Sequence, residues 1–136
     1  MTKQNLEQIY YLSKELKMWE RELERLKARS LVQSPVPRAG TSGGISDKVA
    51  DRAERVMELE SRISAKREEI QQLRDEAVEY IKDIPDSLTR MIIYYRCVSL
   101  MSWRRVAYEV GGSNTEEGVK KVYYRFFEKS CPECPD

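Results

Sequence analysis

The sequence predicts an all-α fold, in which a long antiparallel, coiled-coil-like helical hairpin precedes a C-terminal unit of three short helices. Apolar residues recur at spacings of three and four over most of the chain, rather than in the alternation typical of strands. Charged residues make up 35% of the chain and the mean hydropathy is -0.67, as expected of long helices with solvated faces. Proline and glycine clusters divide this pattern into separate segments.

The first helix is predicted over residues 3–29. Its apolar side chains follow alternating steps of three and four, the spacing of a coiled-coil seam: Ile9, Leu12, Leu16, Trp19, Leu23 and Leu26. Residues 30–45 contain two prolines and three glycines among small polar residues, so we expect a mobile loop there. At about 1.5 Å per residue, the helices on either side are long enough to lie antiparallel with the loop at one tip.

The second helix is predicted to begin at Ser46 or Asp47, which can cap it, and to end at Ile84 before Pro85. The seam resumes along it with Val49, Val56, Leu59, Ile63, Ile70, Leu73, Ala77, Tyr80 and Ile84. Arg52 and Lys66 interrupt this seam, and such breaks can fix the register or orientation of the partner helix. We expect residues 1–84 to form a hairpin that serves as a spacer or as an oligomerisation rod.

The C-terminal unit is predicted over residues 85–130, followed by a flexible tail at 131–136. Asp86 or Ser87 can cap its first helix, whose apolar residues are Leu88, Met91, Ile92, Tyr95 and Val98. Ser102 can cap a second helix over residues 103–110, and the inward positions of that helix are Trp103, Val106, Ala107 and Val110.

Gly111 and Gly112 are expected to end this second helix, because glycine readily takes the left-handed conformation of a helix C-terminus. Two overlapping capping boxes can begin the third helix, namely Ser113 with Glu116 and Asn114 with Glu117. The third helix should run to about Lys129 with its core face formed by Val119, Val122, Tyr123 and Phe126.

Positive charge gathers towards the C-terminal end, although the formal net charge of the chain is only +1. Eight basic and four acidic residues lie between Arg90 and Lys129, against eight basic and eleven acidic between Asp47 and Asp83. Two short helices joined by a glycine turn, the second with basic and aromatic residues on its free face, are typical of a helix-turn-helix that enters the DNA major groove. A three-helix bundle with a solvated basic face is the alternative.

The candidate DNA-binding residues lie on the second and third short helices. Lys120, Lys121 and Arg125 could neutralise phosphates or read guanine edges. Arg104 and Arg105 could clamp the backbone from the preceding helix. The remaining residues on the free face of the third helix are Thr115, Glu116 and Tyr124.

The stretch from Asp86 to Lys129 resembles the fourth conserved region of bacterial sigma factors. The resemblance rests on Leu88-Thr89-Arg90-Met91-Ile92-Ile93-Tyr94-Tyr95-Arg96, on Met101-Ser102-Trp103-Arg104-Arg105-Val106-Ala107 and on Gly118-Val119-Lys120-Lys121-Val122-Tyr123-Tyr124-Arg125. With the charged helical segment before it, the whole chain is similar to phage- or prophage-encoded transcription regulators of the RinA and ArpU type. The resemblance implies a scanning helix with Arg104 and Arg105, and a recognition helix with groove-facing Thr115, Glu116, Lys120, Lys121 and Tyr124.

The start of the proposed recognition helix departs from that pattern. Glu116 and Glu117 suit the helix dipole and can accept a hydrogen bond from a cytosine amine, but phosphate repels them. Gly118 costs a helix about 1 kcal/mol relative to alanine. The other regions of a full sigma factor are missing, which favours an accessory regulator over an initiation factor.

Three functions stay open at the level of sequence. The preferred one is a regulator that binds promoter or operator double-stranded DNA and uses the hairpin to form homo-oligomers or contact another protein. The second is a packaging protein similar to small terminase subunits, which also join helix-turn-helix and coiled-coil parts. The third is an interaction module that docks on RNA polymerase without contacting DNA.

Catalysis, metal binding and membrane insertion are not expected. The chain has no His, no glycine-rich phosphate loop and no nucleophile-base pairing, so neither enzymatic activity nor a cofactor is predicted. Cys131 and Cys134 have the spacing of half a zinc site, but the only other cysteine is Cys97. No apolar run approaches the roughly 20 residues of a membrane span, and no signal peptide is recognised, so a cytoplasmic location is predicted.

Overall fold

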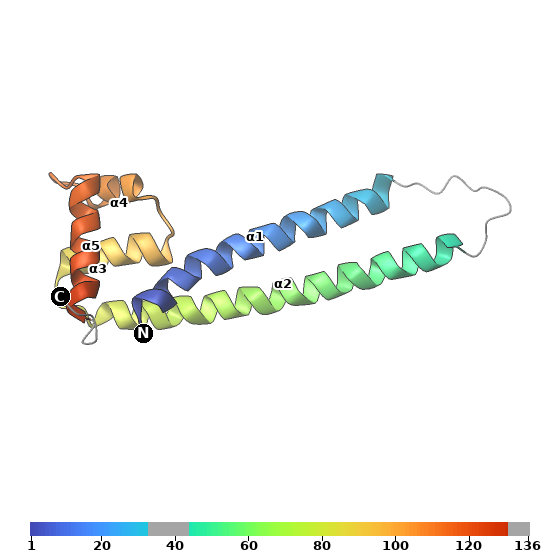
Figure 1. The fold of residues 1–136 in the computed structure, drawn as a ribbon, viewed down its shortest axis with the longest axis horizontal. Coiled ribbons are helices and arrows are strands. Elements are labelled where there is room, and N and C mark those ends of the chain that lie inside the picture. The colour runs from blue at the N-terminus through green and yellow to red at the C-terminus, as the bar shows by residue number, and fades with distance from the viewer. Residues whose placement is uncertain (33–43, 131–136) are drawn as a thin grey trace. The chain divides into compact units, whose positions relative to one another are not determined.

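The computed structural model describes residues 1–32 and 44–130, and every element in this part of the chain is helical (Figure 1). The predicted all-α class is confirmed. The elements, in order, are α1 (Lys3–Val32), α2 (Gly44–Lys82), α3 (Ser87–Ile93), a short π-helix η1 (Tyr94–Val98), α4 (Trp103–Val110) and α5 (Glu116–Ser130).

The chain divides into two compact units. The rod unit is residues 12–69, and the head unit combines residues 1–11 with residues 70–136. This division differs from the predicted boundary between residues 84 and 85. The physical reason is that side chains from the start of α1 and the end of α2, such as Leu6 and Ile81, are buried in the same core as the short helices.

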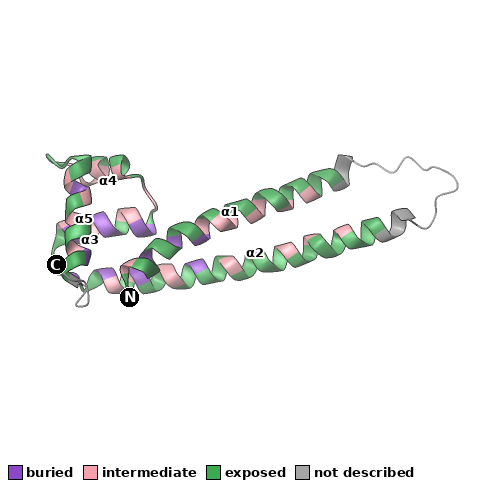
Figure 2. Ribbon diagram, viewed as in Figure 1, coloured by how far each residue is buried: buried purple, intermediate pink, exposed green. Residues whose placement is uncertain are grey.

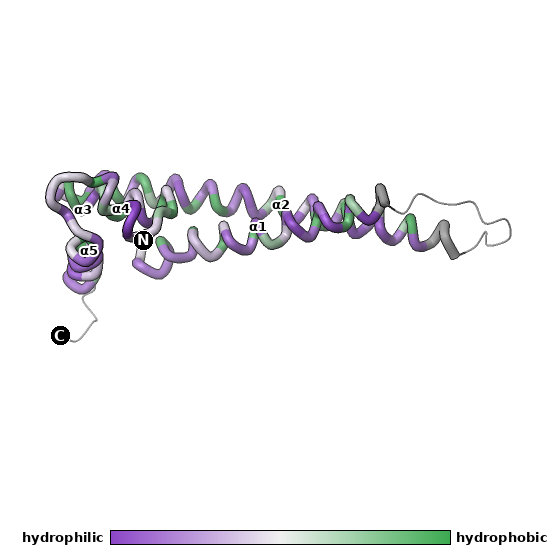
Figure 3. The backbone as a smooth tube through the Cα atoms, turned by 90° about the horizontal axis from the view of Figure 1, so that it is seen from above, coloured by the Kyte–Doolittle hydropathy of each residue, from purple (hydrophilic) through white to green (hydrophobic). Residues whose placement is uncertain are grey.

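In the rod unit, α1 and α2 lie antiparallel, as predicted for the hairpin (Figure 1). Three ion pairs link the two helices: Glu15 with Lys66 (3.5 Å), Glu20 with Arg67 (3.1 Å) and Lys27 with Glu60 (3.1 Å). The apolar side chains between them are buried or half-buried, including Leu12, Leu16, Leu23, Leu59 and Ile63. Figure 3 shows hydrophobic positions at intervals along the mostly hydrophilic helices α1 and α2.

One predicted seam residue does not fit this interface. Val49 is 60% exposed, although its spacing from Val56 places it on the apolar stripe in the sequence. The seam begins instead with half-buried Arg52 and Val56. Met57, one residue further round the helix, is also exposed.

Lys66, the predicted break in the seam, lies between polar and aromatic partners. Only 15% of its side chain is exposed, and its Nζ is 3.5 Å from Glu15, 3.4 Å from Glu69 and 5.0 Å from the centre of the Trp19 ring. Burying an ammonium group requires such compensation. The partly buried charge of Lys66 is therefore compensated by groups on both helices.

The boundaries of the long helices differ from the predicted ones by two or three residues. Helix α1 runs on to Val32 and α2 begins at Gly44, so Ser46 and Asp47 lie inside the first turn of α2 and the predicted caps are wrong. The middle of the predicted loop, residues 33–43, and the predicted tail, residues 131–136, lie outside the described residues.

Helix α2 ends at Lys82, two residues before the predicted end at Ile84. The amides of Asp83 and Ile84 donate to carbonyls only three residues earlier, at 3.3 and 3.1 Å. This tighter turn closes the helix ahead of Pro85.

The core of the head unit draws on every helix. Its buried members are Leu6, Ile9, Ala77, Ile81, Ile84, Ile92, Ile93, Cys97, Val98, Val106, Val119, Tyr123 and Phe127 (Figure 2). Leu6 and Phe127 are core residues that the apolar spacing of the sequence had not singled out. The first turns of α1 are therefore part of the fold of the short helices.

A π-helical turn separates the two halves of the predicted first short helix. Asp86 caps α3, as expected, by accepting hydrogen bonds from the amide and hydroxyl of Thr89 at 3.1 and 2.6 Å. After Ile93 the helix widens, and the amide of Ser99 donates to the carbonyl of Tyr94 at 3.0 Å. One extra residue in the turn shifts the helical phase. Cys97 is buried as a result, together with Val98.

Candidate nucleic-acid interface

Helix α4 begins and ends where the sequence predicts. The Ser102 hydroxyl accepts a hydrogen bond from the amide of Arg105 at 3.2 Å, which caps the helix. At the other end, Gly111 and Gly112 have φ values of 74° and 66°, a region that favours glycine. Val106 is completely buried, which fixes α4 against the head core. The glycine turn then leads directly towards α5.

The N-terminus of α5 is capped by Thr115 and not by either predicted capping box. The Thr115 hydroxyl accepts a hydrogen bond from the amide of Gly118 at 3.0 Å, and the helix begins at Glu116. The side-chain amide of Asn114 donates instead to the carbonyl of Gly111 at 3.0 Å and so braces the turn. Thr115 is therefore engaged in the helix cap, although its side chain is exposed.

The cap also accounts for Gly118, which is otherwise unfavourable near the start of a helix. A Cβ atom added at this position would lie 3.1 Å from the Thr115 hydroxyl oxygen. That distance is tighter than ordinary van der Waals contact. Glycine at this position therefore leaves room for the cap that starts the proposed recognition helix.

The three cations of α5 have different surroundings. Lys120 is 30% exposed at its side chain, and its Nζ lies 3.6 Å from both Glu116 and Glu117. Lys121 and Arg125 are exposed, and neither forms an ion pair with a carboxylate among the described residues. They are one helical turn apart, so both can face the same ligand.

The two arginines of α4 also differ. Arg105 is 2.7 Å from Glu109 and its guanidinium lies 5.3 Å from the centre of the Tyr108 ring. Arg104 is exposed, without an ion pair to any carboxylate of the described residues. Arg104, Lys121 and Arg125 are thus the predicted cations whose charge is least compensated.

Tyr124 belongs to an aromatic cluster at the edge of α5. Its ring is 5.3 Å from Tyr123 and 6.2 Å from Trp103, and Trp103 is 5.0 Å from Tyr123. Tyr124 nevertheless remains 45% exposed. It can therefore present its hydroxyl to a ligand while its ring is fixed by packing.

Two cations that sequence reasoning missed complete this cluster. The guanidinium of Arg96 lies 4.4 Å from the centre of the Trp103 ring and donates to the carbonyl of Met101 at 2.9 Å. The Nζ of Lys3 lies 4.8 Å from the centre of the Tyr124 ring. Arg96 belongs to the stretch from Leu88 to Arg96 that resembles the sigma-factor region, so it could have been found from sequence. Lys3 lies more than a hundred residues from α5 in sequence, and nothing in the residues around it predicts a contact with α5.

A buried thiol lies beneath the aromatic cluster. The Sγ of Cys97 is 3.8 Å from the hydroxyl of Tyr123. Burial raises the pKa of the Cys97 thiol to about 11, and burial also raises the pKa of Tyr123. The neutral thiol is a poor nucleophile and a poor metal ligand at neutral pH.

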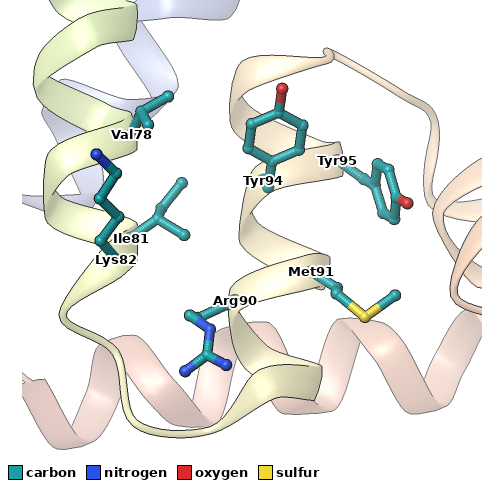
Figure 4. A pocket seen from close by; sticks show the side chains of 7 residues that line it. All are labelled: Val78, Ile81, Lys82, Arg90, Met91, Tyr94 and Tyr95. Carbon is teal, nitrogen blue, oxygen red and sulfur yellow. The ribbon is translucent and has the colours of Figure 1, made fainter.

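An open groove of about 420 Å³ lies elsewhere on the head unit, between the end of α2 and the α3–η1 segment (Figure 4). It is lined by Val78, Ile81, Lys82, Arg90, Met91, Tyr94 and Tyr95. Arg90 donates to the carbonyls of Ile84 and Pro85, and Lys82 pairs with Glu79 at 2.8 Å. None of the predicted DNA-binding residues lines this groove.

The described residues contain no helix that is long and apolar enough to span a membrane. Within the same residues, no group of three or more His, Cys, Asp or Glu side chains is placed to hold a metal ion. Cys131 and Cys134 lie outside them. No model of a protein family, no curated protein and no solved structure matches this chain.

Proposed function

We propose that the head unit binds double-stranded DNA and that α5 enters the major groove as the recognition helix. The observation that supports this most strongly is the exposure of Lys121 and Arg125 on the outward side of α5, without carboxylate partners among the described residues. The capped glycine turn before α5 gives the connection expected of a helix-turn-helix.

In this proposal the two arginines of α4 contact the DNA backbone while α5 reads the groove. Arg104 supplies an uncompensated charge for phosphate, and Arg105 must leave or share its contact with Glu109. Lys121 and Arg125 contact phosphate or guanine edges. Tyr124 contributes a hydroxyl from a ring held by the aromatic cluster.

Lys120 and Glu116 have a different role in the same proposal. Because Lys120 lies between Glu116 and Glu117, it lowers the repulsion between this end of α5 and phosphate. Its own attraction to DNA is reduced by the same pairing. We therefore expect removal of Lys120 to weaken binding less than removal of Lys121 or Arg125.

The biological role proposed for this binding is transcription regulation of the kind carried out by phage and prophage regulators of the RinA and ArpU type. Such a regulator acts on promoter or operator DNA in the cytoplasm and needs no cofactor or enzymatic activity. The helix pair of the rod unit offers the surface for a homo-oligomer or a contact with RNA polymerase.

Fluorescence anisotropy with a labelled duplex tests the proposal. The double variant K121E/R125E should lose salt-sensitive binding, because two attractive charges become repulsive ones near phosphate. The matched control is K17E/R21E, which makes the same charge change at two exposed residues of the rod unit. Equal affinity of the wild type and K121E/R125E would exclude α5 as the DNA-binding helix, and so would equal losses in both double variants.

A further inference from the structure

Lys3 is held in place next to the proposed recognition helix by the first turns of α1. Leu6 and Ile9 are completely buried in the head core. The Thr2 hydroxyl accepts a hydrogen bond from the amide of Asn5 at 3.2 Å, and the Thr2 carbonyl accepts one from the amide of Leu6 at 3.1 Å. The backbone that carries Lys3 is therefore fixed to the same unit as α5.

The charge of Lys3 remains largely available. Its Nζ lies 4.8 Å from the centre of the Tyr124 ring, within the range of a cation–π interaction. Its only ion pair among the described residues is with Glu7 at 3.9 Å, a long distance for such a pair. The side chains of Lys3 and Glu7 are 37% and 46% exposed, so water screens this pair.

Tyr124 connects Lys3 to the cations of α5. Lys120 and Lys121 precede Tyr124 by four and three residues, which places them on the adjacent turn of the same side of the helix. Trp103 and Tyr123 pack against the Tyr124 ring. Tyr124 therefore contacts the ammonium group of Lys3 and lies one helical turn after Lys120 and Lys121.

From this geometry we infer that Lys3 is part of the DNA interface and contacts a backbone phosphate beside the groove that α5 enters. This inference rests on the proposed function. A lysine ammonium suits phosphate as a point charge, and Lys3 lies on α1 rather than on the helix proposed to enter the groove, so a backbone phosphate is its expected contact. The interface would then include the first turn of α1 as well as the helix-turn-helix.

The salt dependence of binding distinguishes a phosphate contact from a purely structural role. Each phosphate contact contributes about 0.9 to the slope of log Kobs against log salt concentration on duplex DNA. The K3M variant keeps an apolar stem but removes the ammonium, so its slope should be shallower by about 0.9. The K3R variant should keep the wild-type slope, because it keeps the charge and the cation–π contact.

The experiment uses anisotropy titrations of the full chain at several salt concentrations, with circular dichroism to show that each variant is folded. K17M is the matched control, since Lys17 is an exposed lysine of α1 in the rod unit, and its slope should equal that of the wild type. If K3M binds more weakly with an unchanged slope, Lys3 acts only through Tyr124 and the inference is overturned. An unchanged slope and affinity would overturn it as well.

The proposed function is tested separately in the same titrations. If K121E/R125E loses binding while K3M keeps the wild-type slope, only the role of Lys3 is rejected. If the wild-type chain binds no duplex at any salt concentration, both proposals are rejected together.

Discussion

The identities of Thr115 and Gly118 depend on each other at the start of α5. Thr115 caps α5 through the amide of Gly118, and a Cβ atom at residue 118 would lie 3.1 Å from the capping oxygen. The sequence contains both residues but favours Ser113 and Asn114 as caps, because the capping-box pattern fits each of them with a glutamate three residues later. Only the backbone path after Gly112 decides among the three candidates.

This pairing makes the effects of G118A and T115A non-additive. In the wild type, G118A should change the free energy of unfolding little, because the higher helix propensity of alanine is offset by crowding of the cap. In the T115A background the crowding is gone, and G118A should stabilise the protein by about 1 kcal/mol. Urea unfolding of the four proteins measures the difference. Equal effects of G118A in both backgrounds would contradict the proposed pairing.

Cys97 and Tyr123 give the head unit a defined response to alkaline pH. Because the pKa of Cys97 is about 11 in the folded protein and ordinarily 9.0, the folded state favours the neutral thiol. The corresponding stabilisation is complete below pH 9 and is lost as pH rises through 11. Burial of Tyr123 acts in the same direction. Denaturant unfolding at pH 8 to 11 should show this loss, and the C97A/Y123F variant should lose less. A steeper loss in that variant would contradict the assignment.

At the scale of elements, regular periodicity was the most reliable sequence signal. The 3-4 spacing predicted the α1–α2 pairing. Asp86 correctly marked the start of α3, and Ser102 and Gly111 correctly marked the two ends of α4. The π-helical turn after Ile93 was not predictable in this way, because its residues keep an α-helical apolar pattern while the backbone takes in one extra residue. The start of α2 at Gly44 was missed because the helix begins in residues of low helix propensity.

Lys66 should matter more for the specificity of helix pairing than for stability. Replacing a partly buried charge in a seam by leucine removes a desolvation cost, so K66L should keep or raise the thermal midpoint. The same change removes the contacts to Glu15 and Trp19 that favour one register, and should therefore increase oligomer formation. Thermal unfolding and analytical ultracentrifugation measure the two effects. A monodisperse K66L protein with a much lower midpoint would show that Lys66 is chiefly a stabilising residue.

At the scale of the whole molecule, the division of the chain depends on contacts between its two ends. The sequence predicts a domain boundary at Pro85, because proline ends the long helix there. This prediction uses only the residues close to Pro85. The buried positions of Leu6 and Ile9 depend on residues 70 to 127, and no local pattern reports such distant packing. For the same reason, the contact between Lys3 and Tyr124 could not be predicted from sequence.

L6A should therefore destabilise the helix-turn-helix although it lies in α1. Leu6 is completely buried, and truncation of such a leucine costs about 2–5 kcal/mol. L23A is the control, since Leu23 is half-buried in the rod unit and its truncation should affect the environment of Trp103 less. Tryptophan fluorescence during denaturant unfolding, with Trp19 replaced by phenylalanine in all variants, reports on Trp103. An unchanged Trp103 transition in L6A would contradict a shared core.

Photocrosslinking to a labelled duplex is the most direct measurement of whether the outward side of α5 meets DNA. A photoreactive amino acid at position 121 should crosslink to bases of the duplex, and competing salt should suppress the reaction. The same group at position 17 in the rod unit should give little product. Crosslinking from position 17 with none from position 121 would contradict the account.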